Sequence, residues 1–127
     1  MNVKEINPLV LAFLGDSIYE VYIRRYLINL GISNVNDLQT KSIDYVSAKS
    51  QASILKTMMD NNFFDEEELD VIKRARNSKS KSHPKNCDIV TYKHATAFEA
   101  IIGYLSLVNQ ENRINEIMEY IFNEKAN

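Results

Sequence analysis

A chain of 127 residues is long enough for one domain with a single core, and its 45% hydrophobic and 25% charged residues are ordinary for a globular protein. The net charge of −2 by itself argues against a nucleic-acid partner, and the single cysteine, Cys87, excludes an internal disulfide and argues against a structural zinc site. The N-terminus lacks the apolar stretch of a signal peptide, and the longest apolar run, residues 9–14, is too short to span a membrane, so we expect a cytoplasmic protein with no membrane contact.

The first half of the chain reads as helices. Asn7 is a good N-cap with Pro8 at the first helical position, and Gly31 is a natural stop, which predicts a helix over residues 8–30. A short helix is expected over residues 33–42, capped by Asn34 or Asn36. Another is expected over residues 44–62, where apolar side chains recur at helical spacing.

The second half continues the helical pattern. Asp65 is expected to cap a helix that runs to about Asn77, with three glutamates in its first turn, where the helix dipole favours them. Residues 78–88 are polar and basic and contain Pro84, so they predict a loop. A strongly apolar helix from about Tyr92 and an amphipathic helix over residues 111–125 follow. No alternating run is long enough for a strand, and the predicted fold is all-α.

The first predicted helix contains residues that a buried helix does not usually carry. Apolar side chains cover nearly its whole circumference, which indicates burial on most sides. Gly15 and Asp16 nevertheless lie in its middle, and a buried carboxylate is costly unless something pairs it. Glu20 and Arg24 can form an ion pair at their four-residue spacing, whereas Asp16 and Glu20 repel each other. Asp16 is therefore left without a cation.

The second apolar helix repeats this arrangement. Glu99 is the only acid between Asp88 and Glu111, its neighbours are apolar, and Gly103 follows one turn later. Small residues let helices or a ligand come close. Carboxylates from two helices can hold Mg²⁺, which commonly binds one or two carboxylates together with waters and phosphate oxygens. The alternative is that both acids are structural residues with partners of their own.

Two motifs together resemble a known family. The segment FLGDSIYE, residues 13–20, resembles the signature helix of ribonuclease III, and ATAFEAIIGYL, residues 95–105, resembles the second carboxylate helix of that family. The spacing between the motifs, and the basic loop before the second one, are similar to the shortened branch known as Mini-III. The likeness extends from about Asn7 to Phe122.

The resemblance implies an all-helical ribonuclease III catalytic domain over residues 1–127, homodimeric and without a double-stranded-RNA-binding domain. It implies Mg²⁺-dependent hydrolysis of phosphodiesters in double-stranded RNA, leaving 5′-phosphate and 3′-hydroxyl ends, in processing of the 5′ and 3′ ends of the 23S ribosomal RNA precursor. By the same resemblance, Asp16 and Glu99 are the catalytic acids and the metal ligands. A ribosomal-protein helper is conceivable, and the sequence identifies none.

The sequence departs from the family's usual set of four carboxylates. The position four residues before Asp16 is Ala12, and the position three residues before Glu99 is Thr96. Leu9 replaces an acid that is often found seven residues before Asp16. We therefore expect an active variant with fewer metal ligands, in which water fills the gaps.

Two other side chains are candidates for a supporting role at the metal. Glu20 could order a metal-bound water, or it could serve only as the partner of Arg24, which we favour; Thr96 is the second candidate. The metal itself would lower the pKa of a bound water and stabilise charge on the scissile phosphate. The sequence leaves open whether one or two metals bind.

A basic segment, Lys73 to Lys85, is the candidate RNA contact. It holds six Lys or Arg residues and no acid, whereas residues 65–70 just before it hold five acids. A charge run is usually a solvated surface, yet this one precedes the helix of Glu99, so we expect phosphate contacts here. The expected contacts are Arg74, Arg76, Asn77, Lys79, Lys81 and Lys85. Lys93 and His94, near the start of the next helix, are weaker candidates.

The competing hypothesis is a non-catalytic, dimeric RNA-binding protein with a degenerate ribonuclease III site. The missing acids favour it, while the retention of Asp16 and Glu99 in apolar surroundings opposes it. Both hypotheses share a homodimer, because the first helix is apolar on more sides than a monomer of five or six helices easily covers.

Overall fold

The computed structural model describes residues 1–78 and 85–126, and every regular element within them is helical. This confirms the all-α prediction. The elements are η1, a 3₁₀ turn at Val3–Glu5, then α1, Pro8–Asn29; α2, Val35–Val46; α3, Ala48–Asp60; α4, Glu66–Arg76; α5, Ile89–Leu107; and α6, Glu111–Ala126. None of these described helices has the length and apolar character needed to cross a lipid bilayer.

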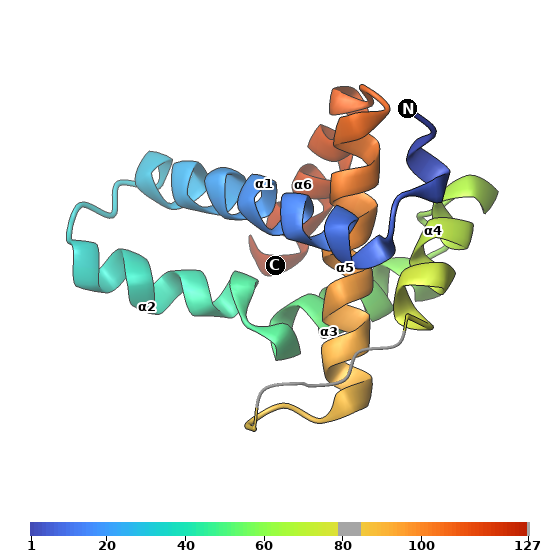
Figure 1. Ribbon diagram of the computed structural model, residues 1–127. Helices are drawn as coiled ribbons and strands as arrows, with labels where there is room; N and C mark the ends of the chain where they lie inside the picture. Colours follow the sequence, from blue (N-terminus) through green and yellow to red (C-terminus); the bar gives the residue numbers. More distant parts are fainter. Residues whose placement is uncertain (79–84, 127) are drawn as a thin grey trace.

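Helix α5 lies at the centre of the fold (Figure 1). Helix α1 crosses it, and α3 and α4 also pack against it. Its residues 95–98 and 100–105 are buried. Helix α2 folds back beside α1, and the two form a hairpin that extends away from the other helices in Figure 1. The helix that carries Glu99 is therefore the one that the rest of the core surrounds.

The ends of α1 follow the signals in the sequence. The Asn7 side chain accepts a hydrogen bond from the N–H of Leu9 at 2.9 Å, and Pro8 occupies the first turn. After α1 the chain turns at Gly31, whose φ of +93° lies in the left-handed region that favours glycine. The predicted helix over residues 8–30 is thereby confirmed.

Two predicted helix boundaries are wrong, because in each a capping side chain sets the true end. The break expected near residue 43 lies at Ser47, whose hydroxyl accepts a hydrogen bond from the N–H of Ser50 at 3.1 Å. Helix α5 begins at Ile89, three residues before the predicted start. The Asp88 carboxylate caps it by accepting a hydrogen bond from the N–H of Thr91 at 2.9 Å.

A buried ion pair joins the N-terminal ends of α4 and α6. The guanidinium of Arg113 donates to both carboxylate oxygens of Glu68, at 2.7 and 2.9 Å, and the Glu68 side chain is only 5% exposed. Glu68 also completes the capping box of α4 with Asp65. Arg113 further donates to the carbonyl oxygen of Phe63 at 2.7 Å and lies over its ring. Arg113 of α6 thus contacts the Glu68 carboxylate, the Phe63 carbonyl oxygen and the Phe63 ring at once.

One side of α1 is uncovered. Val10, Phe13 and Val21 are 55%, 84% and 54% exposed, and their spacing places them on the same side of the helix. We refer to these three residues as the apolar face of α1. The expectation that α1 is buried on most sides is wrong for this face, since the described part of the chain does not cover it.

Candidate active site

Helices α1 and α5 touch backbone to backbone at two glycines. A Cβ atom on Gly15 would lie 1.7 Å from the carbonyl oxygen of Glu99, and one on Gly103 would lie 2.0 Å from the carbonyl oxygen of Leu11. Both distances are far inside van der Waals contact, so only glycine fits at these two positions. Of the two reasons the sequence offers for these small residues, the close approach of two helices is therefore the one observed.

The glycine crossing brings the two candidate catalytic acids together. Asp16 directly follows Gly15 on α1, and the backbone of Glu99 on α5 lies against Gly15 together with that of Gly103. The two carboxyl groups are neighbours, because Asp16 is among the groups that raise the pKa of Glu99. Asp16 is exposed and Glu99 is half-buried. The expectation of a buried carboxylate is therefore wrong for Asp16, which faces solvent beside a partly buried partner.

The environment of Glu99 favours its protonated form. Its pKa is raised to about 8, chiefly by burial and then by the hydrogen bond to Asp16 and the negative charge of Asp16. The charge of Glu20 acts in the same direction, and the hydrogen bond from Gln51 opposes it. At neutral pH and without a cation, Glu99 thus keeps its proton. A divalent cation between the two carboxylates would take the place of that proton.

The donor set fits Mg²⁺, with few protein ligands. Two neighbouring carboxylates, one of them open to solvent, are what Mg²⁺ commonly uses, with waters and phosphate oxygens completing its shell. Residues 1–78 and 85–126 contain no cluster of three or more His, Cys, Asp or Glu side chains suited to a metal ion. Ala12 and Thr96, which stand where the resemblance to ribonuclease III leads one to expect acids, are both buried, and Ala12 packs in the hydrophobic core.

Glu20 lies one turn after Asp16 and is half-buried. Its Oε2 is 3.7 Å from Nη2 of Arg24, and the Arg24 side chain is 72% exposed. A solvent-exposed pair of this kind contributes at most about 1 kcal/mol to stability. Because the charge of Glu20 also acts on Glu99, the ion pair does not remove Glu20 from the site. The geometry is compatible with both predicted roles of Glu20, the ion pair with Arg24 and a supporting role beside Glu99.

Sequence reasoning missed a third side chain at the carboxylate pair. Gln51 of α3 is only 2% exposed, and its Nε2 donates to Oε2 of Glu99 at 3.5 Å. It shares a face of α3 with the fully buried Leu55 and Met58. The sequence did contain a signal for Gln51, because a primary amide among apolar residues on one helix face is a buried polar group that needs a partner.

Arg74, a predicted RNA contact, is directed toward the N-terminal segment. Its Nε lies 3.2 Å from the Asp70 carboxylate, and its Nη1 donates to the carbonyl oxygen of Lys4 at 2.5 Å. Its Nη2 is buried without a hydrogen-bond partner among the described residues. These contacts tie α4 to η1, and they occupy the guanidinium that was expected to meet phosphate.

The other predicted contacts are differently placed. Arg76 is the half-buried last residue of α4, and Asn77 caps that helix. Lys85 is exposed. Lys79 and Lys81 lie outside the described residues.

Arg76 borders a basic hollow of about 480 Å³. Lys49 and Lys56 of α3 and His94 of α5 also line this hollow, and Asp60 is the acid among its lining residues. The basic hollow, as we call it, gathers basic side chains from three helices. Sequence reasoning named Arg76 and His94 and did not connect them to α3.

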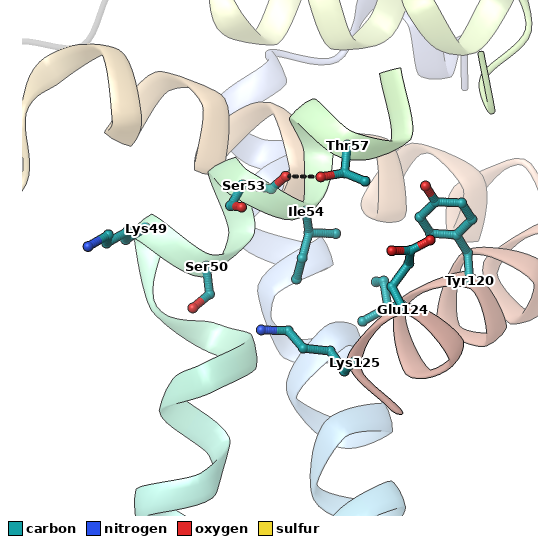
Figure 2. A pocket seen from close by; sticks show the side chains of 9 residues that line it. Lys49, Ser50, Ser53, Ile54, Thr57, Tyr120, Glu124 and Lys125 are labelled. Atoms are coloured by element: carbon teal, nitrogen blue, oxygen red, sulfur yellow. Dashed lines mark hydrogen bonds between the residues drawn. The ribbon is translucent and has the colours of Figure 1, made fainter. Parts of the chain in front are cut away.

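A second hollow, of about 350 Å³, lies between α3 and α6 (Figure 2). Figure 2 shows Lys125 extending into it from α6, whereas Lys49 points away from α6. The Nζ of Lys125 donates to the carbonyl oxygen of Asp44 at 2.8 Å. Neither Asp16 nor Glu99 lines this hollow, so it is separate from the carboxylate pair.

Comparison with known proteins places this geometry in context. A model of the Ribonuclease III domain matches residues 9–110 of the chain. The chain is 53% identical over 116 residues to the Mini-ribonuclease 3 of Brevibacillus brevis, covering 91% of this chain and 85% of that protein. It is 45% identical to the Mini-ribonuclease 3 of Enterococcus faecalis, covering 92% and 89% of the two chains.

A solved structure also matches. An X-ray crystal structure of a protein from Fusobacterium nucleatum superimposes with a TM-score of 0.85 at 37% sequence identity. The match covers 98% of both chains. The arrangement of helices described above is therefore similar to an experimentally determined fold over almost its whole length.

Proposed function

The chain belongs to the ribonuclease III family and is an endoribonuclease, and from this premise we propose that it cleaves double-stranded RNA by Mg²⁺-dependent hydrolysis. The observation that carries the proposal is the pair of carboxylates, Asp16 and Glu99, held together where two glycines let α1 and α5 touch. We propose further that residues 1–127 form one catalytic domain. Its substrate in the cytoplasm is the 23S ribosomal RNA precursor, with cleavage near the 5′ and 3′ ends.

Asp16 and Glu99 are the residues that would hold Mg²⁺. When bound, the ion supplies a Lewis acid that activates water and stabilises negative charge on the scissile phosphate. Glu99 would bind the cation as the deprotonated carboxylate, and its partly buried position keeps the carboxylate in one place. Asp16, being exposed, leaves the outer side of the pair open to an RNA backbone. Ala12 and Thr96 offer no carboxylate, so water and the phosphate would have to supply the remaining ligands of the ion.

The RNA is held by phosphate contacts from the catalytic domain's own basic residues. The basic hollow and the exposed Lys85 supply four cations, Lys49, Lys56, Arg76 and Lys85, together with the imidazole of His94. Phosphate contacts position a duplex without reading its bases, and double-stranded RNA is recognised mainly by shape. Asn77, Lys79 and Lys81 stay in the proposal as further contacts, whereas Arg74 is assigned a structural role because Asp70 and Lys4 engage it.

A homodimer completes the proposal. The apolar face of α1 exposes three large side chains in a row, and such a patch on a globular protein typically marks an interface. A two-fold axis through this face would pair the patch with itself and present two carboxylate pairs to one duplex, one for each strand.

The test is cleavage of a labelled RNA duplex by purified protein in Mg²⁺ and in EDTA. We expect cleavage in Mg²⁺ only. Asp16→Asn and Glu99→Gln should each reduce the cleavage rate at least about a hundredfold while the circular dichroism spectrum stays helical. Binding of the duplex without cleavage by the wild-type protein in Mg²⁺ would instead favour the non-catalytic alternative.

A further inference from the structure

Gln51 is a buried polar residue whose partner lies in the candidate active site. Its side chain is 2% exposed on the face of α3 that packs toward α5, in line with Leu55 and Met58. Its amide Nε2 donates to Oε2 of Glu99 at 3.5 Å. Burying an amide without a partner costs roughly 1–3 kcal/mol, so a core position of this kind favours an apolar side chain unless the amide has a task.

We propose that Gln51 is a positioning residue that orients the Glu99 carboxylate toward Asp16 and so raises the affinity of the pair for a divalent cation. The inference rests on the proposed function in one respect: it takes the carboxylate pair to be the cation site. A metal-binding carboxylate is typically itself hydrogen-bonded by neighbouring groups, which fix its orientation. Among the described residues, Gln51 makes the side-chain hydrogen bond to Glu99 from a helix other than α1.

The chemistry of an amide suits this task better than that of a charged side chain. A lysine at position 51 would neutralise Glu99 and compete with the cation. A glutamate would place a further negative charge beside two carboxylates that already repel each other. The amide N–H group donates to one oxygen of Glu99 without changing its charge, and the other oxygen stays free for the cation.

Packing of helix α3 in the core fixes the position of the backbone that carries Gln51. The fully buried Leu55 and Met58 anchor the same face of this helix, one and two turns after Gln51. The hydrogen bond therefore connects Glu99 to a third helix that the crossing of α1 and α5 does not involve. Two helices set how far apart the acids lie, and the third sets how the Glu99 carboxylate is turned.

The experiment measures cation binding without RNA, on the full chain. Mn²⁺, a paramagnetic substitute for Mg²⁺, is titrated into the wild-type protein, Gln51→Met, Asp16→Asn and the control Met58→Leu, and free Mn²⁺ is followed by electron paramagnetic resonance. Methionine keeps the length and apolar stem of glutamine and removes only the amide. Met58→Leu changes a buried side chain on the same face of α3 with no link to the acids. Melting temperatures in EDTA are recorded for all four proteins.

We expect Gln51→Met to weaken Mn²⁺ binding by about 10- to 100-fold. Its melting temperature in EDTA should stay within a few degrees of the wild type, and Met58→Leu should bind Mn²⁺ normally. In cleavage assays Gln51→Met should need correspondingly more Mg²⁺ for half-maximal rate, with the KM for RNA unchanged. A variant that melts earlier yet binds Mn²⁺ with wild-type affinity would show that Gln51 is only a packing residue and overturn the inference.

The two proposals fail separately. A wild-type protein that cleaves duplex RNA while Gln51→Met matches its Mn²⁺ affinity and Mg²⁺ requirement overturns the positioning role alone. A wild-type protein that binds Mn²⁺ through Asp16, loses affinity in Gln51→Met and cleaves no RNA overturns the proposed function and supports the positioning role. Wild-type protein that binds no Mn²⁺ overturns both.

Discussion

The carbonyl oxygen of Glu99 occupies the space that a β-carbon on Gly15 would need. The separation of the two catalytic candidates is therefore fixed by contact between two backbones. A side chain can adopt another rotamer to relieve crowding, whereas a helix backbone within the core cannot move without displacing its neighbours.

Gly15→Ala should destabilise the protein. In an unobstructed helix, alanine stabilises by about 1 kcal/mol relative to glycine. Here the added methyl group meets the Glu99 carbonyl, so we expect a loss of about 1–3 kcal/mol or more, measured by urea denaturation. Ser17→Ala, an exposed change on the same helix, is the control and should be nearly neutral. A stabilised Gly15→Ala protein would contradict the close approach.

The metal-free protein should lose stability as pH rises. Folding raises the pKa of Glu99 from its ordinary 4.5 to about 8, so the folded state holds a proton that the unfolded state has released. The stabilising effect is complete below about pH 4.5 and is lost as pH rises through 8, a change on the order of a few kcal/mol.

Thermal melts in EDTA at pH 6 and pH 9 measure this change. Glu99→Gln should flatten the difference between the two values, and Mg²⁺ at pH 9 should restore wild-type stability by replacing the missing proton. Equal pH dependence in the wild type and in Glu99→Gln would rule out this origin.

Arg113→Met should be one of the most damaging substitutions outside the site. It would leave the nearly buried carboxylate of Glu68 without its cation, which typically costs about 3–5 kcal/mol. Lys4→Met removes the solvent-exposed ion pair with Glu67 and should leave the free energy of unfolding nearly unchanged. Denaturant midpoints compare the two, and similar losses would mean that burial does not decide the outcome.

The salt dependence of RNA affinity should distinguish Arg74 from Arg76 and Lys85. Each lost phosphate contact flattens the slope of log K against log salt by about 0.9, the value for duplex DNA. Arg76→Ala with Lys85→Ala should therefore flatten the slope by nearly 2, for every duplex sequence alike. Arg74→Ala should leave the slope unchanged and lower the melting temperature, because its guanidinium binds Asp70 and Lys4. A flattened slope in Arg74→Ala would return this residue to the RNA surface.

Phe13→Glu should produce a monomer if the apolar face of α1 is the dimer interface. A charge in the centre of an apolar contact costs several kcal/mol of association free energy. Phe13 is 84% exposed, so the fold of the single chain should survive, and the melting curve tests this. Analytical ultracentrifugation at micromolar concentration compares the variant with the wild type. An unchanged sedimentation coefficient would place the interface elsewhere.

The local features of the fold could be predicted from the sequence. Asn7 and Asp65 cap helices within a few residues of themselves, so the information that defines those helix ends is contiguous. The glycine and the acid in each apolar helix could also be recognised in the sequence, because both residue types are costly in a buried helix. Ser47 was missed since serine is common inside helices as well as at caps.

The long-range contacts could not be predicted. Gln51 and Glu99 are 48 residues apart, and the apolar stripe of α3 that marks Gln51 as buried does not show which residue is its partner. Arg74 was predicted to contact RNA because of its charge, and its hydrogen bond to a backbone carbonyl 70 residues away was not foreseen. A backbone carbonyl leaves no trace in the side-chain pattern, so a sequence cannot reveal that it engages an arginine.

Helix α1 runs unbroken from Pro8 to Asn29, and Phe13 and Asp16 lie less than one turn apart on it. The exposed apolar face and the exposed carboxylate thus belong to one rigid rod. A substitution that rotates α1 by a few degrees and so redirects Phe13 would rotate Asp16 by the same angle. Evolutionary change in the apolar face and evolutionary change around the Asp16 carboxylate are therefore mechanically coupled, and each limits the other.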